Sequence, residues 1–240
     1  MAIHTRTKRL ESKSKRINCK YGKCGGKVMN REELLKVSKP ILFNTEMVQA
    51  VVDGRKTVTR RVVKAEDIYL IDNIISANIK NSRGVSHKHF YGHIKHFIEN
   101  YSPYKVGDIL YVRETWCRAD DGYYYKAGFK DTEGLMKVYG YKWHPSIHMP
   151  KEIARIFLKI TDVRVERLQE IDRLWSNYDR EGMRNPKTEN ISIAMQEKFI
   201  DVWNSTIKKQ EIDKYGWEAN PWVWVIEFER VEVEDEDIKN

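Results

Sequence analysis

The chain has 240 residues, of which 41% are hydrophobic, and a net charge of +8. This length is enough for one large domain with a sizeable core. The sequence has no apolar run of 18 residues and no apolar segment near its start, which argues against a membrane span and a secretion signal. Three cysteines at irregular spacings exclude a disulfide framework and favour a reducing compartment, so we expect a cytoplasmic protein.

The positive charge is concentrated at the N-terminus. Residues 1–40 carry 12 lysines and arginines against 3 acidic residues, whereas the other 200 residues carry 31 against 32. We predict that residues 1–38 form a flexible basic arm, with one short helical turn near Glu32–Val37, that binds nucleic acid nonspecifically. The folded domain is predicted at 39–233 and an acidic tail at 234–240. Cys19 and Cys24 in the arm lack a second pair of ligands, so we expect no metal and no cofactor.

Hydrophobic patterns predict many short strands and few helices. The predicted strands are 40–43, 58–63, 109–116, 123–126, 154–161, 163–167 and 222–233. The predicted helices are one capped by Thr45 and ended by Gly54, one over 168–178, and one over 192–205 that buries Ile193, Phe199, Val202 and Trp203. The weakly patterned, histidine-rich stretch 64–104 is predicted to be a surface insertion. Because strands and helices do not alternate, we predict an α+β fold with a small mixed β-barrel covered by helices.

One turn between a predicted helix and strand gathers polar chemistry. It contains four cations, with Gly54 before them and three β-branched residues among them: Arg55, Lys56, Thr57, Val58, Thr59, Arg60 and Arg61. The glycine permits a left-handed helix end, and the β-branched residues favour an extended chain, so a lysine and two hydroxyls meet at the rim of a sheet. This arrangement indicates a site for an anionic or amide ligand. The alternative is a solvated basic turn.

Two further segments carry candidate ligand-binding residues. The strand at 109–116 ends in Arg113, Glu114 and Trp116, which is typical of a pocket mouth, and Tyr125 lies on the next strand. The loop 142–150 contains two prolines together with Trp143, Ser146 and His148. We interpret this loop as functional, with a proline-braced lid over the core as the alternative.

Several of these motifs, in this order, resemble the ASCH domain of the PUA-like superfamily, and most of all the larger ASCH proteins of tailed phages and prophages. The resemblance covers about residues 39–230. The motifs are Asp53–Arg61, Val106–Leu110, Val112–Trp116, Trp143–Pro150, Asp162–Leu168, Glu181–Gly182, Tyr215–Trp217 and Trp222–Phe228.

The resemblance implies a PUA-like barrel whose cleft takes RNA or a modified base. Small bacterial ASCH enzymes are amidohydrolases of N4-acetylcytidine, and their proposed catalytic lysine, threonine and glutamate match Lys56, Thr59 and Glu181. A lysine base near pH 7 needs its pKa lowered by about three units from about 10.4. Burial and the cations Arg55, Arg60 and Arg61 act in that direction. The small hydrolases are less than half as long as this chain, so the turn is also compatible with binding alone.

Three functions follow as hypotheses. The first is binding of RNA or a modified nucleotide, in which Arg60, Arg61 and Arg113 contact phosphate and Trp116, Tyr125 or Trp143 stacks on a base. The second is hydrolysis of an N4-acylated cytidine. The third is a phage accessory or morphogenesis role through protein contacts, in the cytoplasm of a bacterial host.

Overall fold

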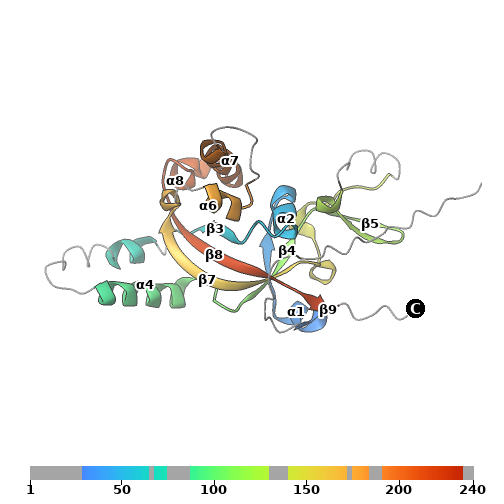
Figure 1. The fold of residues 1–240 in the computed structure, drawn as a ribbon, viewed down its shortest axis with the longest axis horizontal. Coiled ribbons are helices and arrows are strands. Elements are labelled where there is room, and N and C mark those ends of the chain that lie inside the picture. Colours follow the sequence, from blue (N-terminus) through green and yellow to red (C-terminus); the bar gives the residue numbers. More distant parts are fainter. Residues whose placement is uncertain are drawn as a thin grey trace, which may run out of the picture.

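The computed structural model describes residues 29–64, 68–74, 87–129, 140–171, 175–183 and 191–234. A five-stranded sheet in the order β2-β4-β7-β8-β3 forms its centre (Figure 1). The strands are β2 (Lys39–Leu42), β3 (Val58–Val62), β4 (Ile109–Arg113), β7 (Phe157–Arg167) and β8 (Trp222–Val231). The β2 and β4 strands are parallel, and the other neighbouring strands are antiparallel. The predicted α+β class is therefore confirmed.

The two edge strands of the sheet are β2 and β3. Within the described residues no backbone pairing joins them, so the sheet is open and the predicted closed barrel is not seen. A side chain spans the gap instead, because an Arg61 guanidinium nitrogen donates a hydrogen bond to the Leu42 carbonyl at 3.1 Å. We call this gap the seam. It places Leu42, the last residue of β2, next to Arg61, near the end of β3.

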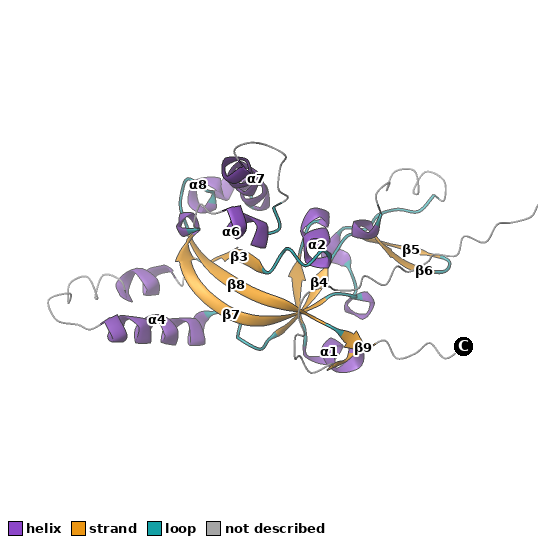
Figure 2. Cartoon of the chain, viewed as in Figure 1, coloured by secondary structure: helices purple, strands orange, loops and turns teal. Residues whose placement is uncertain are grey.

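The core lies on both faces of the sheet. Strand β8 is buried along most of its length, which explains why its sequence is a nearly continuous apolar run. Helices α6 (Trp175–Arg180), α7 (Ile191–Thr206) and α8 (Ile212–Tyr215) gather at one end of the long β7–β8 pair (Figure 2). Helix α7 buries Met195, Phe199 and Trp203, which are four residues apart and share one face. The prediction that Ile193 is buried is wrong: it lies off this face and is 57% exposed.

Helix α2 (Thr45–Val52) starts with a cap that the sequence pattern misplaced by one residue. The Asn44 side-chain oxygen accepts a hydrogen bond from the Met47 amide at 2.8 Å, so Asn44 is the N-cap and Thr45 is the first helical residue. The prediction of Thr45 as the cap is therefore wrong. Both residue types are good caps, and only the backbone distinguishes the two positions.

Asn44→Ala is expected to lower the free energy of unfolding by about 1 kcal/mol, because the Met47 amide loses its acceptor. Thr45→Ala is the matched control and is expected to have a much smaller effect. Urea denaturation of both variants tests this. Equal losses in the two variants would contradict the assigned cap.

The predicted arm overlaps the fold at its C-terminal end. Helix α1 (Arg31–Val37) buries Leu34 completely against the core, and β1 (Met29–Asn30) pairs with β9 (Val233–Glu234). The boundary predicted at residue 38 is thus ten residues too late, because Leu34 and hydrogen bonds from Arg31 to the Glu152 and Ala154 carbonyls dock this charged helix. Residues 1–28, with Cys19 and Cys24, and residues 235–240 of the acidic tail lie outside the described residues.

Four predicted elements differ from the observed ones. The predicted strand 109–116 ends at Arg113, and β5 (Trp116–Ala119) starts a separate hairpin with β6 (Gly122–Tyr125). The strands predicted at 154–161 and 163–167 are one strand, β7, with a register shift between Ile160 and Asp162. The predicted helix 168–178 is a 3₁₀ turn at Leu168–Glu170 followed by α6. Other 3₁₀ turns are Lys126–Gly128, Ser146–His148, Lys151–Ile153 and Lys209–Glu211.

The insertion at 64–104 contains helical structure. Residues 68–74 are helical, and α4 covers His87–Tyr101. Helix α4 is attached to the core by Phe97, which is 1% exposed and stacks on Trp224 with ring centroids 5.5 Å apart. No helix in the described ranges is long and apolar enough to cross a membrane.

Candidate functional site

The basic turn between α2 and β3 is held by backbone hydrogen bonds. Gly54 has a φ of 75°, which ends the helix as predicted, and the Arg55 and Lys56 amides donate to the Ala50 carbonyl at 2.9 and 3.0 Å. The Thr57 amide donates to the Arg180 carbonyl at 2.9 Å. The turn is therefore fixed both to its own helix, α2, and to the end of α6. Glu181 is the residue that directly follows α6.

Lys56 is buried, with 4% of its surface exposed. Its Nζ donates to the carbonyls of Val58 and Glu181, both at 2.7 Å, and to the Glu181 carboxylate at 3.2 Å. It also lies 5.4 Å from the centre of the Phe43 ring. The three protons of the ammonium therefore have three oxygen acceptors.

Glu181 joins two cations in the interior. It is 4% exposed, and its second carboxylate oxygen accepts a hydrogen bond from Arg60. Arg60 also lies 3.6 Å from the Glu166 carboxylate. The next residue, Gly182, has a φ of 90°, and a Cβ there would lie 3.2 Å from the Lys56 side chain and 3.0 Å from Ala50. Glycine is therefore required at this position by both conformation and space.

Burial is the main influence on the lysine. It lowers the pKa of Lys56 from 10.5 to about 8, against the opposing effect of Glu181, and the nearby Arg61 and Arg60 lower it further. Arg55 was predicted to share this role. Its guanidinium instead faces the carbonyls of Gly182 and Met183 and the carboxylates of Asp53 and Asp179.

Thr59 completes the group. It is 2% exposed, and its hydroxyl oxygen accepts a hydrogen bond from Arg61 at 2.9 Å. Because the oxygen accepts this bond, its own proton is free to be donated elsewhere. The pKa of Arg61 is lowered by burial, with Tyr104 and Glu181 acting in the opposite direction.

A cavity of about 680 Å³ opens at the seam, and several of these side chains line it. Its polar wall contains Lys56, Thr59, Arg60, Arg61 and Glu181. Its apolar wall comes from β2, α7, β8 and the segment after α4, and includes Phe43, Tyr101, Tyr104, Phe199, Val202, Trp203, Ile207 and Trp224. This volume is within the range of small-molecule sites. The structure thus brings together five of the sequence-predicted site residues.

The other predicted residues do not line this cavity. Arg55 stays in the turn, and the remaining ones lie in a second region. Arg113 donates to the carbonyls of Met149 and Ile147, which ties β4 to the loop 142–150. Glu114 is 1% exposed and accepts two hydrogen bonds from Arg155, at 2.8 and 2.9 Å. Arg113 therefore braces the loop, whereas Glu114 holds Arg155, which lies between the loop and β7.

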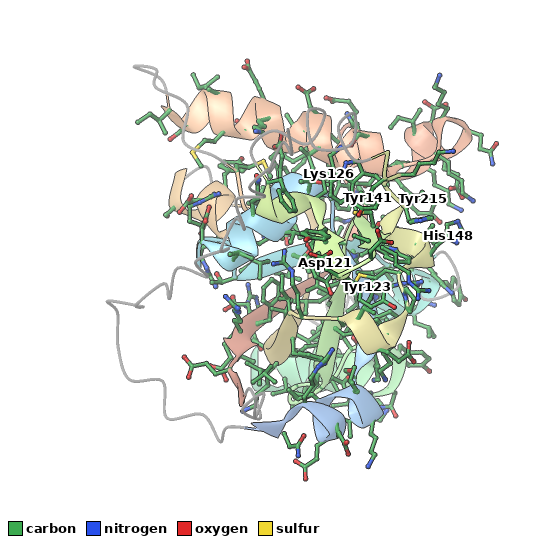
Figure 3. The ribbon with its side chains drawn as sticks, turned by 90° about the vertical axis from the view of Figure 1, so that its right-hand side faces the viewer. Asp121, Tyr123, Lys126, Tyr141, His148 and Tyr215 are labelled. Atoms are coloured by element: carbon green, nitrogen blue, oxygen red, sulfur yellow. The ribbon has the colours of Figure 1, made fainter. Side chains whose placement is uncertain are left out.

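The predicted aromatic residues also make internal contacts. Trp116 stacks on His144 at 4.8 Å, and Trp143 lies 6.3 Å from Phe129. The Tyr125 hydroxyl donates to the Ile153 carbonyl, and Arg155 covers the Tyr125 ring at 4.4 Å. Ser146 and His148 lie in a 3₁₀ turn of the same loop. This hairpin end faces the viewer in Figure 3, where Tyr123, Tyr141 and His148 are labelled.

A chain of ion pairs behind the polar wall was not predicted. Arg164 contacts Glu166 at 2.9 Å and Glu227 at 2.7 Å, and Arg180 contacts Glu227 at 2.7 Å and the Thr57 hydroxyl at 3.2 Å. Through Thr57 and Arg180, this chain contacts the residues next to Lys56 and Glu181 in the sequence. The only sequence signal was the run of alternating acids and arginines at 162–167, which becomes informative once the strand partners are known.

The described residues contain no group of three or more histidine, cysteine or acidic side chains that would hold a metal ion. Comparison of the chain with family models, with curated proteins and with solved structures finds no match. Membership of the ASCH family therefore rests on the sequence motifs and stays a prediction.

Proposed function

We propose that the cavity at the seam hydrolyses an amide on a modified cytidine, as an N4-acylcytidine amidohydrolase. The observation that carries this proposal is that Lys56, Thr59 and Glu181 line one cavity, with Lys56 and Glu181 in contact although they are 125 residues apart in the chain. These are the three positions that the ASCH resemblance names as catalytic. A buried lysine with a pKa of about 8 adds a group that can exchange protons near neutral pH.

The arrangement supports a two-step acyl transfer. The Thr59 oxygen attacks the acyl carbon while the neutral form of Lys56 takes the hydroxyl proton, and Arg61 stabilises the oxygen through its hydrogen bond. The C–N bond then breaks as the amine leaves with a proton from the Lys56–Glu181 pair. Water hydrolyses the resulting acyl-threonine, which releases a carboxylic acid and restores the hydroxyl.

We propose that the five-stranded sheet is an incompletely closed PUA-like barrel whose cleft is the seam between β2 and β3. The curvature of the long β7–β8 pair and the hydrogen bond from Arg61 to Leu42 across the gap support this assignment.

Binding of RNA or a modified nucleotide without chemistry is the second candidate. One observation favours it: the three acceptors around the Lys56 Nζ suit the charged ammonium, which is not a base. In this candidate Lys56 organises the site and the ligand is held but not cleaved. The internal contacts of Arg113, Trp116, Tyr125 and Trp143 give no support to stacking or phosphate binding by these residues.

Incubation of the protein with N4-acetylcytidine, followed by chromatography for cytidine, tests the hydrolase. Thr59→Val removes the hydroxyl at nearly constant shape and is expected to reduce turnover at least about 100-fold. Thr161→Val, at an exposed position on β7, is the matched control and is expected to retain full turnover. Absence of cytidine with the unaltered protein would reject hydrolysis and leave the binding candidate. Cytidine release at equal rates by the two variants would reject Thr59 as the nucleophile.

A further inference from the structure

The cavity at the seam has an excess of positive charge. Four cationic side chains line it, Lys56, Arg60, Arg61 and Lys64, whereas Glu181 is the only carboxylate among the described lining residues. Glu166 compensates Arg60 in part, from 3.6 Å. Positive charge of this density inside a protein is normally balanced by negatively charged partners, and the described residues supply fewer carboxylates than cations here.

Arg60, which lines the cavity, has an unused hydrogen-bond donor. The residue is 8% exposed, and its terminal nitrogens are used by Glu181 and Glu166. Its Nε is buried and has no hydrogen-bond partner. Buried donors are almost always satisfied, so an orphaned guanidinium nitrogen beside a cavity indicates an absent acceptor.

Two further cations lie toward the opening. Arg61 is partly exposed and spans the seam, and Lys64 is exposed just beyond the end of β3. Guanidinium groups match the geometry of oxyanions, because their N–H groups form a planar fork, and a lysine adds a flexible point charge. The cationic side of the cavity thus extends from the buried Arg60 to the solvent.

We propose that these three residues, Arg60, Arg61 and Lys64, form an oxyanion subsite, and that the natural ligand of the cavity is a nucleotide whose phosphate occupies it. This inference rests on the proposed function, since it assigns a ligand class to the same cavity. A nucleoside would leave the cationic excess uncompensated. A nucleotide places its base and its reacting amide near Lys56 and Thr59, and its phosphate supplies the absent acceptor. The volume of about 680 Å³ accommodates a ligand of this size.

Isothermal titration calorimetry on the full chain tests the subsite with four probes: cytidine 5′-monophosphate, cytidine, inorganic phosphate and acetate. The monophosphate is expected to bind at least about tenfold more tightly than cytidine, and this advantage is expected to shrink as salt is added. Inorganic phosphate is expected to compete with the monophosphate. Stronger competition by acetate than by phosphate would assign the subsite to the carboxylate product instead and overturn the nucleotide proposal.

Charge-neutralising variants test which side chains give the monophosphate its higher affinity. Arg61→Gln and Lys64→Gln are each expected to remove most of the advantage of the monophosphate over cytidine. Arg118→Gln, at an exposed position on β5 outside the cavity, makes the same change of charge and is expected to leave the advantage intact. Lys64 is exposed, so its variant tests the proposal even if Arg61→Gln disturbs folding. Equal affinities of the two nucleosidic probes, no binding of either, or equal losses in all three variants would overturn it.

The result is separable from the hydrolase proposal. Turnover of N4-acetylcytidine with no preference for the monophosphate would reject the subsite and retain the hydrolase. A preference for the monophosphate that depends on Lys64, without turnover of either acetylated form, would retain the subsite and reject the hydrolase.

Discussion

Replacement of Glu181 by glutamine is expected to lower the free energy of unfolding by about 3–5 kcal/mol. The glutamate is 4% exposed and is the carboxylate shared by Lys56 and Arg60, which are themselves buried. Glutamine keeps the shape but leaves two neighbouring cations in the interior without their counter-charge. Urea denaturation with linear extrapolation measures the loss.

Two comparisons show whether the loss comes from unpaired charge. Glu229→Gln breaks an exposed pair with Lys159 at 3.8 Å and is expected to cost less than about 1 kcal/mol. Lys56→Met combined with Glu181→Gln is expected to cost less than the sum of the single changes, because the methionine removes one of the stranded cations. Additive effects would show that the loss does not come from the contact of Glu181 with Lys56.

The rate of amide hydrolysis is expected to rise with pH up to about 8 and to level off above it. In the proposed mechanism the base is the neutral form of Lys56, whose pKa is about 8. At pH 6 roughly one molecule in a hundred carries the neutral amine, so the rate is expected to be about 100-fold below its plateau. Lys56→Met is expected to remove this dependence and to lower the plateau by about 100-fold or more. A rate of the unaltered protein that is independent of pH from 6 to about 9 would exclude Lys56 as the base.

The titration of Lys56 is also expected to make the folded protein more stable as the pH rises. The pKa of Lys56 is about 8 in the folded protein and 10.5 for an ordinary lysine, so the unfolded chain binds more protons between these values. The free energy of unfolding therefore gains roughly 3 kcal/mol as the pH rises from about 8 to about 10.5, when the unaltered protein is compared with Lys56→Met. The comparison with the variant removes the contribution of other groups that titrate at alkaline pH.

The local part of the site could be predicted from the sequence because it depends on short-range rules. A glycine after an amphipathic helix and β-branched residues after it specify the turn that carries Lys56 and Thr59. The partner of Lys56 could not be found this way, because Glu181 is 125 residues away and its position depends on how α6 meets the sheet.

The second region shows where local rules fail. Arg113, Glu114 and Trp116 were predicted at one pocket mouth because they follow one another at the end of a strand. The strand ends at Arg113, and Arg155 covers Glu114 from a distant loop. Likewise, the arm is predicted to reach residue 38 because the segment is polar, basic and low in large apolar side chains, although buried Leu34 and the hydrogen bonds of Arg31 dock α1. Composition describes the average surface of a segment, whereas docking depends on single side chains.

The contact between Lys56 and Glu181 also has a consequence for folding kinetics. The sheet that brings them together pairs Lys39 with Leu110 and Thr59 with Ile226, so most of its ladders close over long stretches of chain. Such topologies have high contact order and fold slowly, since each loop must close before the contact stabilises it. The site is therefore absent from any partly folded form that lacks the β3–β8 ladder. Recovery of binding or turnover after dilution from denaturant reports the last stage of assembly, when α6 and the turn meet.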